Sequence, residues 1–390
     1  MKNFNLERFN LKMLELGERK LKLKTTSYKE VIVNNEYLVN EKDEKIGTKG
    51  DMYTKLIMDK ILSEGTLDYN PRPHYEDLYK GAKYYKKDNM VVTKDGDEIK
   101  LGEKNRVFEK ENGIEVWTPA HTLSINEGVS CSYDLSRGES PITTLRPIAI
   151  KSSIAEILWI YQKESNDLVL FDKMLEKNSW EEDKKINNWW KSWALKDSLG
   201  NYILNDKGHP TIGACYGETV RRRHMLKKEV IDAIKWNPDG RRHITNLWQI
   251  DDFNEMHGLK PCAFLTDWNV RHDWDGKNYL DMTLIQRSND FATAGCINQV
   301  QYAALLKMVA NEVEMEAGVF TWKPINVQLY DRHIDQSIEM LNRNPIECKA
   351  TIECNNKKWE DFTPNDIYIS DYPMELIKTK NKQLKFPLGI

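Results

Sequence analysis

The sequence predicts an α+β fold in which helices pack on one face of a mostly antiparallel or mixed sheet. Apolar residues recur at helical spacing in residues 50–66, 153–162 and 297–316. The segment "CAFLTDWNV…YLDMTLIQRS" is predicted to form two strands joined by the turn-rich "RHDWDGKN", and "KPINVQLY" adds another strand. With 390 residues, of which 40% are hydrophobic, the chain can bury one large core plus an appendage, or two domains.

We expect an N-terminal appendage in residues 1–50 and a catalytic domain in residues 51–390. The appendage is rich in Lys, Glu and Asn, and its stretch "EVIVNNEYLV" alternates as a short strand pair does. The main domain carries a charged insertion at about residues 75–115, in which "KDGDE" is a candidate hairpin turn. The insertion carries no residues to which we assign chemistry.

The main domain is expected to begin with an amphipathic helix in "GDMYTKLIMDKILSEGT", which Gly65 would end. A second helix, "SIAEILWIYQ", places Glu156 among apolar residues. A carboxylate in that position either has its hydrogen bonds supplied by other core residues or takes part in catalysis. A long helix follows in "INQVQYAALLKMVANEVEME", and "DRHIDQSIEMLNR" predicts the next one.

Composition excludes several classes of protein. The 57 Lys and Arg nearly balance the 60 Asp and Glu, so the net charge of −3 gives no reason to expect nucleic-acid binding. The first residues form no apolar signal segment, and no run of 18 apolar residues predicts a membrane span, so we expect a cytoplasmic protein. The cysteines lack metal-like or disulfide-like spacing and are predicted to be free thiols, with no metal site; they are Cys131, Cys215, Cys262, Cys296, Cys348 and Cys354.

Arginines occur in three places where a phosphate could be bound. They are Arg72 in "NPRP", Arg241 and Arg242 in "NPDGRRH", and Arg287 in "QRSND", where Ser288 follows. A guanidinium group can donate two parallel hydrogen bonds to phosphate oxygens, and a serine hydroxyl can donate a further one. A lone Arg pair is more often a solvated surface feature, so none of these motifs is sufficient alone.

In combination these motifs resemble the thymidylate synthase family. "NPDGRRHITNLW" precedes a cysteine that follows a proline, then "QRSND", then a helix that starts near "IN". "AEILWIYQ", "NWWKSW", "ACYGE" and the terminal "KFPLGI" also resemble family segments. The resemblance runs from about residue 52 to the end, apart from the insertion. It implies a thymidylate synthase-like fold with a large mixed sheet that forms the interface of a homodimer, in which Arg241 and Arg242 act across the interface.

The resemblance also implies a reaction. The substrates would be dUMP and 5,10-methylenetetrahydrofolate, and a cysteine thiolate would attack carbon 6 of the uracil to make carbon 5 nucleophilic. Nearby arginines would favour this thiolate. The implied catalytic residues are Cys262, Glu156, Tyr216 and Asn298. The implied nucleotide-binding residues are Arg72, Arg241, Arg242, Arg287, Ser288, Gln286, Asp290, Asn298, Gln328 and Tyr330. Folate would contact Trp190, Trp193, Asp290, Gly295 and Ile390.

Two of these residues make specific chemical predictions. Glu156, buried among Ile154, Ile157 and Trp159, is expected to have a raised pKa suited to relaying protons through water. Asn298 would recognise uracil, because its amide can donate to O4 and accept from N3–H. An aspartate there would suit cytosine, which makes dCMP a weaker candidate substrate.

The sequence departs from the family near the folate side. Gln328 replaces a usual histidine, and "FATAGCIN" replaces a usual "LGxPFN" segment. Ala263 stands directly after the nucleophile, where many members have a histidine that a Gram-positive subclass also lacks. These substitutions, together with the chain length and the N-terminal appendage, resemble bacteriophage deoxyuridylate hydroxymethylases. In those enzymes water captures the intermediate, and the product is 5-hydroxymethyl-dUMP. Thymidylate synthase itself, which makes dTMP by hydride transfer, is the alternative, and Trp190 favours it. A catalytically inert homologue is a third possibility.

Overall fold

The computed structural model describes the main body of the chain and several short strands. Residues 46–72, 120–177, 188–197, 199–254, 259–274, 276–330 and 333–386 are described, together with the strands within 32–39 and 83–118 listed below.

A seven-stranded sheet forms the centre of the fold, with strand order β11-β12-β13-β14-β9-β3 and with β10 also paired to β14. β13 runs parallel to β14, whereas the other pairs are antiparallel, so the predicted mixed sheet is confirmed. The strands are β3 (Thr66–Arg72), β9 (Ala120–Ile125), β10 (Cys131–Asp134), β11 (His243–Asn246), β12 (Ala263–His272), β13 (Asn278–Asp290) and β14 (Glu316–Tyr330).

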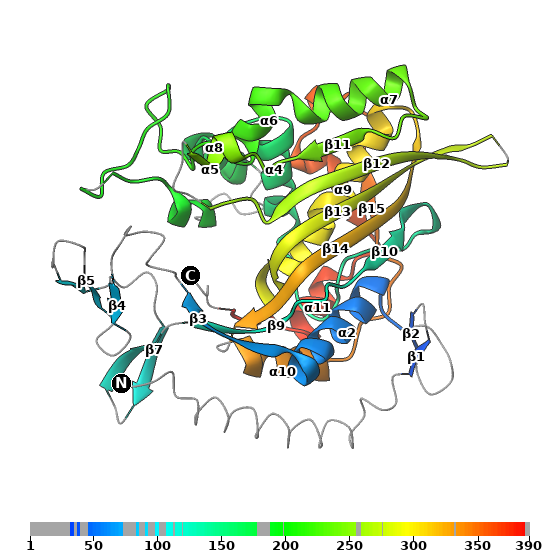
Figure 1. Ribbon diagram of the computed structural model, residues 1–390. Coiled ribbons are helices and arrows are strands. Elements are labelled where there is room, and N and C mark those ends of the chain that lie inside the picture. The colour runs from blue at the N-terminus through cyan, green and yellow to red at the C-terminus, as the bar shows by residue number, and fades with distance from the viewer. Residues whose placement is uncertain are drawn as a thin grey trace.

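Helices cover one face of this sheet (Figure 1). The longest, α9, is buried along most of its length and packs against β13, β14 and α4. A helix that is apolar on nearly all sides belongs in the interior. The helices are α2 (Lys49–Glu64), α4 (Ile150–Tyr161), α5 (Leu168–Lys177), α6 (Gly217–Arg223), α7 (Ala233–Trp236), α8 (Ile250–Asn254), α9 (Cys296–Glu312), α10 (Ile334–Asn342) and α11 (Met374–Lys380).

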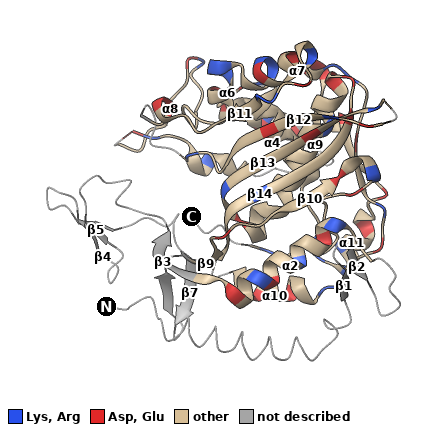
Figure 2. Cartoon of the chain, turned by 45° about the vertical axis from the view of Figure 1, so that its right-hand side comes forward, with Lys and Arg blue, Asp and Glu red and all other residues tan. Residues whose placement is uncertain are grey.

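The opposite face of β12, β13 and β14 has no helix over it in the described part of the chain (Figure 1). In β13, buried residues such as Leu280, Met282 and Leu284 alternate with half-buried ones such as Thr283 and Ile285. Charged side chains gather mainly on the helices, including α2, α6 and α7, while β13 and β14 are mostly uncharged (Figure 2). The sheet therefore presents an open face of mixed character.

The expected helices are present, with shifted ends. Helix α2 begins at a capping box between Thr48 and Asp51 and ends before Gly65, as predicted. The helix expected at 297–316 instead ends at Glu312, because Glu314 adopts a left-handed φ of 57° that reverses the chain into β14. Strand β14 consequently begins at Glu316, well before the "KPINVQLY" stretch.

The smaller strands agree with several turn predictions. β1 pairs with β2 in the "EVIVNNEYLV" stretch, and β5 pairs with β6 across the "KDGDE" turn. The division of the chain into an appendage and a catalytic domain stays a prediction. These strands are β1 (Ile32–Asn34), β2 (Tyr37–Val39), β4 (Lys83–Tyr85), β5 (Met90–Val92), β6 (Glu98–Lys100), β7 (Val107–Glu111), β8 (Ile114–Thr118), β15 (Thr351–Cys354) and β16 (Ile367–Ser370).

Candidate active site

Cys262 lies at the entry of β12, where its backbone and its thiol both contact other predicted site residues. The backbone N–H of Cys262 donates to the Tyr216 hydroxyl over 2.9 Å, and Arg287 Nη2 lies 3.5 Å from the Cys262 Sγ. Cys262 is half-buried, whereas Cys131 and Cys215 are fully buried packing residues whose thiol pKa burial raises above the ordinary value. Cys262 therefore differs from the packing cysteines in both contacts and access.

Opposing effects act on the Cys262 thiol. Burial raises its pKa, and the Arg287 guanidinium and the Tyr216 hydrogen bond lower it. In the single chain the balance is a raised pKa. The expected assistance from arginine is present in Arg287, but burial outweighs it in this structure.

Arg287, on β13, is held in place by the loop that carries the nucleophile. Its Nε donates to the Pro261 carbonyl over 3.0 Å and its Nη2 to the Lys260 carbonyl over 2.9 Å. Its guanidinium also lies over the Trp248 ring, 5.6 Å from the centroid. These contacts fix a positive charge beside Cys262.

Glu156 lies on α4 in a buried position, with only 8% of its surface exposed. Burial raises its pKa to about 7, and the hydrogen bonds from Trp190 and Gln301 lower it. The Trp190 Nε1 donates to Glu156 Oε1 over 3.1 Å. The raised pKa predicted from the sequence is confirmed, and a carboxyl that titrates near neutrality suits proton relay.

Tyr216 and Trp190 connect the Glu156 carboxyl to Cys262, the candidate nucleophile. Their rings meet edge to face with centroids 5.1 Å apart. Tyr216 has a strained φ of 46°, and Gly217 follows it because a Cβ there would lie 2.2 Å from the Ser165 backbone oxygen. This turn aims the Tyr216 hydroxyl at the Cys262 loop. Trp193, in the same short helix as Trp190 (Trp189–Trp193), is half-buried.

Asn298, in the first turn of α9, is engaged by neighbouring amides. Its Oδ1 accepts from Gln286 Nε2 over 3.1 Å and from Asn289 Nδ2 over 3.2 Å. Its Nδ2 donates to Gln301 Oε1 over 2.9 Å. Recognition of a pyrimidine by Asn298 stays a prediction, and it requires some of these bonds to be exchanged for bonds to the base.

Gln301, which was not predicted from the sequence, contacts two of the candidate site residues. It accepts from Asn298, bonds to Glu156, and donates through Nε2 to the Ser153 carbonyl over 3.1 Å. It therefore joins the candidate base-recognising amide to the candidate proton relay. The signal available in the sequence was its spacing: residues three apart share a helix face, and Gln301 follows Asn298 by three positions.

The stretch "FATAG" forms a π-helix, Phe291–Gly295, between β13 and α9. π-Helical turns are rare and often occur at functional sites. Gly295 is required there, because a Cβ would lie 2.5 Å from the Phe291 ring. Just before this turn, Asp290 Oδ2 accepts from Thr293 Oγ1 over 2.5 Å, and its buried Oδ1 accepts no hydrogen bond from the described residues.

The remaining residues of the nucleotide set lie near the carboxyl ends of β13 and β14. Gln328 lies opposite Asp290 in the parallel pair of β13 and β14, and Ser288 lies opposite Asn326. Tyr330, at the end of β14, is buried, as is Gln328. Gln286 lies opposite Ala263, the residue after the nucleophile, and also bonds to Asn298.

Several predicted residues are not brought to this cluster. Arg241 and Arg242 are exposed and precede β11, whose first residue, His243, pairs with Trp268, six residues after Cys262. Because a strand rises about 3.3 Å per residue, this end of the pair is distant from Cys262. The side chain of Arg72 and the whole of Ile390 lie outside the described residues.

The described residues include neither a group that could hold a metal ion nor a helix that could cross a membrane. No group of three or more His, Cys, Asp or Glu is arranged to hold a metal ion. No helix in this part of the chain has the length and apolar character to cross a membrane.

Comparison with known proteins gives one family. Residues 103–382 match the family model described as thymidylate synthase. The thymidylate synthase of Lactococcus lactis subsp. lactis is 39% identical over 266 residues, which cover 67% of this chain and 85% of the relative. That of Streptococcus pneumoniae is 34% identical over 343 residues, covering 88% and 100%. Thermostable thymidylate synthase A from Bacillus subtilis aligns with a TM-score of 0.60 at 26% identity, over 87% of this chain and 99% of that one.

Proposed function

This chain belongs to the thymidylate synthase family, and from that premise we propose that it converts dUMP to dTMP with methylenetetrahydrofolate, which becomes dihydrofolate. The observation that carries the proposal is the connected set Cys262–Tyr216–Trp190–Glu156, which joins a nucleophile to a carboxyl with a pKa of about 7. The relatives described above are thymidylate synthases, and they favour hydride transfer over the hydroxymethylation that we expected from the sequence.

The thiol of Cys262 begins the reaction. As a thiolate it adds to carbon 6 of the uracil, the ring electrons move toward O4, and carbon 5 becomes a nucleophile. Arg287, 3.5 Å from Sγ, stabilises the thiolate, and phosphate-binding arginines would add to this effect. Asn298 would hold the base edge by donating to O4 and accepting from N3–H.

The residues around Asp290 are suited to binding methylenetetrahydrofolate. The Asp290 Oδ1 is buried without a hydrogen bond from the described residues, so it can accept one from a pterin N–H. When bound, methylenetetrahydrofolate supplies the one-carbon unit and, in the synthase reaction, the hydride. Trp190 and Trp193 would line this region, and Gly295 leaves room beside it.

Glu156 is the group that accepts and relays protons in the proposed reaction. After carbon 5 is alkylated, its proton must leave, and a carboxylate with a pKa near 7 can accept it through water. Gln301 links Glu156 to Asn298, so proton relay and base recognition share one hydrogen-bonded group. The thiolate of Cys262 is finally expelled, which restores the double bond between carbons 5 and 6.

A second candidate is hydroxymethylation of dUMP, in which water replaces hydride. The π-helix of "FATAG" and the buried Gln328 beside Asp290 favour it, because both lie where folate would be held. The balance between hydride and water depends on how folate is positioned and whether water is excluded.

One experiment separates the two products. The purified protein is incubated with dUMP and methylenetetrahydrofolate, and the absorbance of dihydrofolate is followed. The mass of the nucleotide product is then measured by mass spectrometry. Dihydrofolate with a methylated product supports the synthase. A hydroxymethylated product without dihydrofolate establishes the hydroxymethylase and overturns the first proposal.

We also propose that the protein acts as a homodimer in the cytoplasm. Arg241 and Arg242 are exposed and distant from their own Cys262, which is the arrangement expected if they complete a partner's phosphate site. The open face of β12–β14 supplies a surface on which a second copy can pack (Figure 1). Sedimentation at working concentration tests the dimer, and a monomer with full activity would contradict it.

A further inference from the structure

The half-buried ring of Phe386, the last described residue, contacts two buried polar side chains. Its ring lies 5.4 Å from the His333 ring at an interplanar angle of 80°, and the Arg146 guanidinium lies 5.2 Å from its centroid. His333 and Arg146 are themselves buried, at 0% and 5% exposure. A guanidinium over an aromatic face is attracted to the ring electrons, and the attraction grows as water is removed.

Phe386 is the end of a segment that is docked at several points along the same surface. Asn381 Nδ2 donates to the Thr144 carbonyl over 2.9 Å, and Arg343 Nη1 donates to the carbonyls of Leu145 and Lys382 over 2.9 and 2.6 Å. These hydrogen bonds hold the segment from Asn381 to Phe386 beside residues 144–146, and they fix the position of Phe386.

His333 and Arg146, the two side chains that contact Phe386, are also connected to Asp290. On one side, His333 Nδ1 lies 3.5 Å from Asp290 Oδ1. On the other, Arg146 Nη2 donates to the Ala292 carbonyl over 2.8 Å and approaches the Thr293 carbonyl at 3.3 Å. Thr293 Oγ1 in turn donates to Asp290 Oδ2. Each oxygen of the Asp290 carboxylate is therefore connected to Phe386 by a separate route.

We propose that Phe386 is a positioning residue that sets the Asp290 carboxylate through His333 on one side and through Arg146 and the π-helix on the other. Phe386 itself touches no reacting atom. Its loss lets the imidazole and guanidinium relax, and the carboxylate then loses its fixed orientation toward the folate side. This inference rests on the proposed function, in which Asp290 binds the pterin of the co-substrate.

The experiment is a double-mutant cycle on the KM for methylenetetrahydrofolate. Phe386→Ala is compared in the wild-type background and in an Asp290→Asn background, with kcat and the Kd for dUMP measured for each protein. In the wild-type background we expect KM to rise about tenfold while the dUMP Kd changes less than about twofold. In the Asp290→Asn background the same substitution should raise KM less than about twofold, because coupled residues are not additive.

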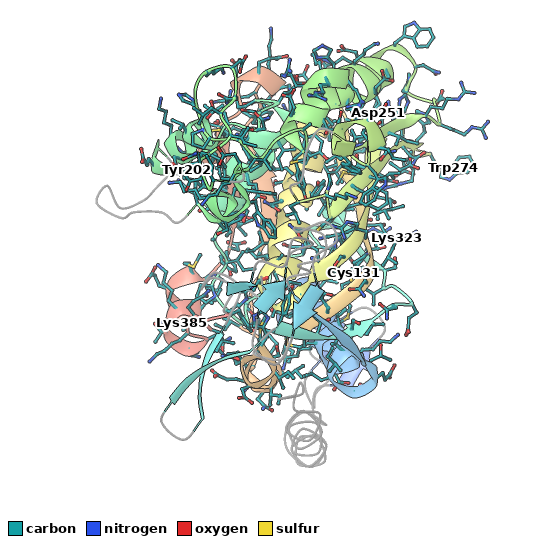
Figure 3. All side chains as sticks on the ribbon, turned by 60° about the vertical axis from the view of Figure 1, so that its left-hand side comes forward. Cys131, Tyr202, Asp251, Trp274, Lys323 and Lys385 are labelled. Atoms are coloured by element: carbon teal, nitrogen blue, oxygen red, sulfur yellow. The ribbon has the colours of Figure 1, made fainter. Side chains whose placement is uncertain are left out.

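Equal effects of Phe386→Ala in the two backgrounds would overturn the proposal, because Phe386 would then act independently of Asp290. If Phe386→Ala does not purify, Phe386→Leu keeps much of the apolar volume without the aromatic face and is judged by the same criterion. Lys385→Ala is the matched control, since this neighbouring side chain is exposed at the edge of the molecule (Figure 3) and should leave KM unchanged.

The result is distinguishable from a failure of the proposed function. If the wild-type protein does not consume methylenetetrahydrofolate with dUMP, the proposed function fails before any variant is compared. If the wild type turns over and the two substitutions act additively, only the positioning role of Phe386 fails.

Discussion

The Trp190 indole donates its N–H to the Glu156 carboxyl over 3.1 Å, and the Trp190 ring also packs edge to face on Tyr216. One side chain thus contacts both the candidate proton relay and the residue that holds the nucleophile's backbone. The properties of Glu156 consequently depend on Trp190 as well as on burial.

Replacing Trp190 by Phe should shift the pH dependence of kcat. The Trp190 hydrogen bond lowers the pKa of Glu156, so its removal raises that pKa further above about 7. Because the proton relay needs the carboxylate, the acidic limb of the pH–rate profile should move to higher pH. Trp193→Phe is the control, and an unchanged limb in Trp190→Phe would remove Glu156 from the relay.

Glu156→Gln should change how stability depends on pH. Burial raises the pKa of Glu156 from 4.5 in the unfolded chain to about 7, so ionisation disfavours the folded state. The wild type should lose stability as pH rises from about 4.5 to 7, by up to about 3 kcal/mol. The variant should lack this loss and be the more stable protein at pH 8. Urea unfolding at pH 5 and pH 8 measures it, and equal pH slopes for the two proteins would refute the raised pKa.

Cys262→Ala should reduce turnover of dUMP by at least about a thousandfold, because no other thiol can form the adduct. The Kd for dUMP should change little, since the sulfur is not expected to hold the ground-state nucleotide. Cys348→Ala, another half-buried thiol, serves as control. Normal turnover in Cys262→Ala would exclude covalent catalysis by this residue.

Arg287→Ala should weaken dUMP binding by about 1.5–3 kcal/mol, the size of a lost hydrogen bond to a charged group. Arg271→Ala is the matched control on the neighbouring strand, because that guanidinium pairs with Asp281. Titration calorimetry with dUMP and with deoxyuridine separates the phosphate contribution. If deoxyuridine binding suffers as much as dUMP binding, Arg287 has another role.

Mixing two inactive variants should restore activity if the arginines act across a dimer. Cys262→Ala and Arg241→Ala chains are each expected to be nearly inactive. After subunit exchange about half of the dimers are mixed, and each holds one intact site, so activity should approach about a quarter of wild type. Failure of the exchanged mixture to exceed the separate variants would place Arg241 outside the partner's site.

Much of the fold could be predicted from the sequence, because periodicity and turn residues are local signals. Helix α4, the β12–β13 hairpin and the end of α2 at Gly65 are examples. The end of α9 was placed too late, since the left-handed Glu314 has no distinctive sequence signal. The π-helix likewise could not be predicted, because its extra residue per turn depends on how β13 meets α9.

The site could be predicted in part. Motif order indicated Cys262, Glu156 and Arg287 as candidates, and the apolar neighbours of Glu156 predicted its raised pKa. The sequence did not show that Asn298 is held by other amides or that Gln301 joins it to Glu156, because these contacts connect α9 to β13 and α4. The hydroxymethyl product was inferred from substitutions near the folate side, the chain length and the N-terminal appendage, and the relatives favour the methyl product.

The parallel pairing of β13 with β14 has a consequence for folding. Parallel strands require a crossover, and here the π-helix and α9 make it, so residues 286–330 fold as one strand–helix–strand unit. Most residues proposed to bind the nucleotide belong to this unit, as does Asp290, which is proposed to bind the pterin. Its contacts are distant in sequence, so it should form slowly. Nucleotide and folate, which bind only after it has closed, should then protect its amides from hydrogen exchange as a group.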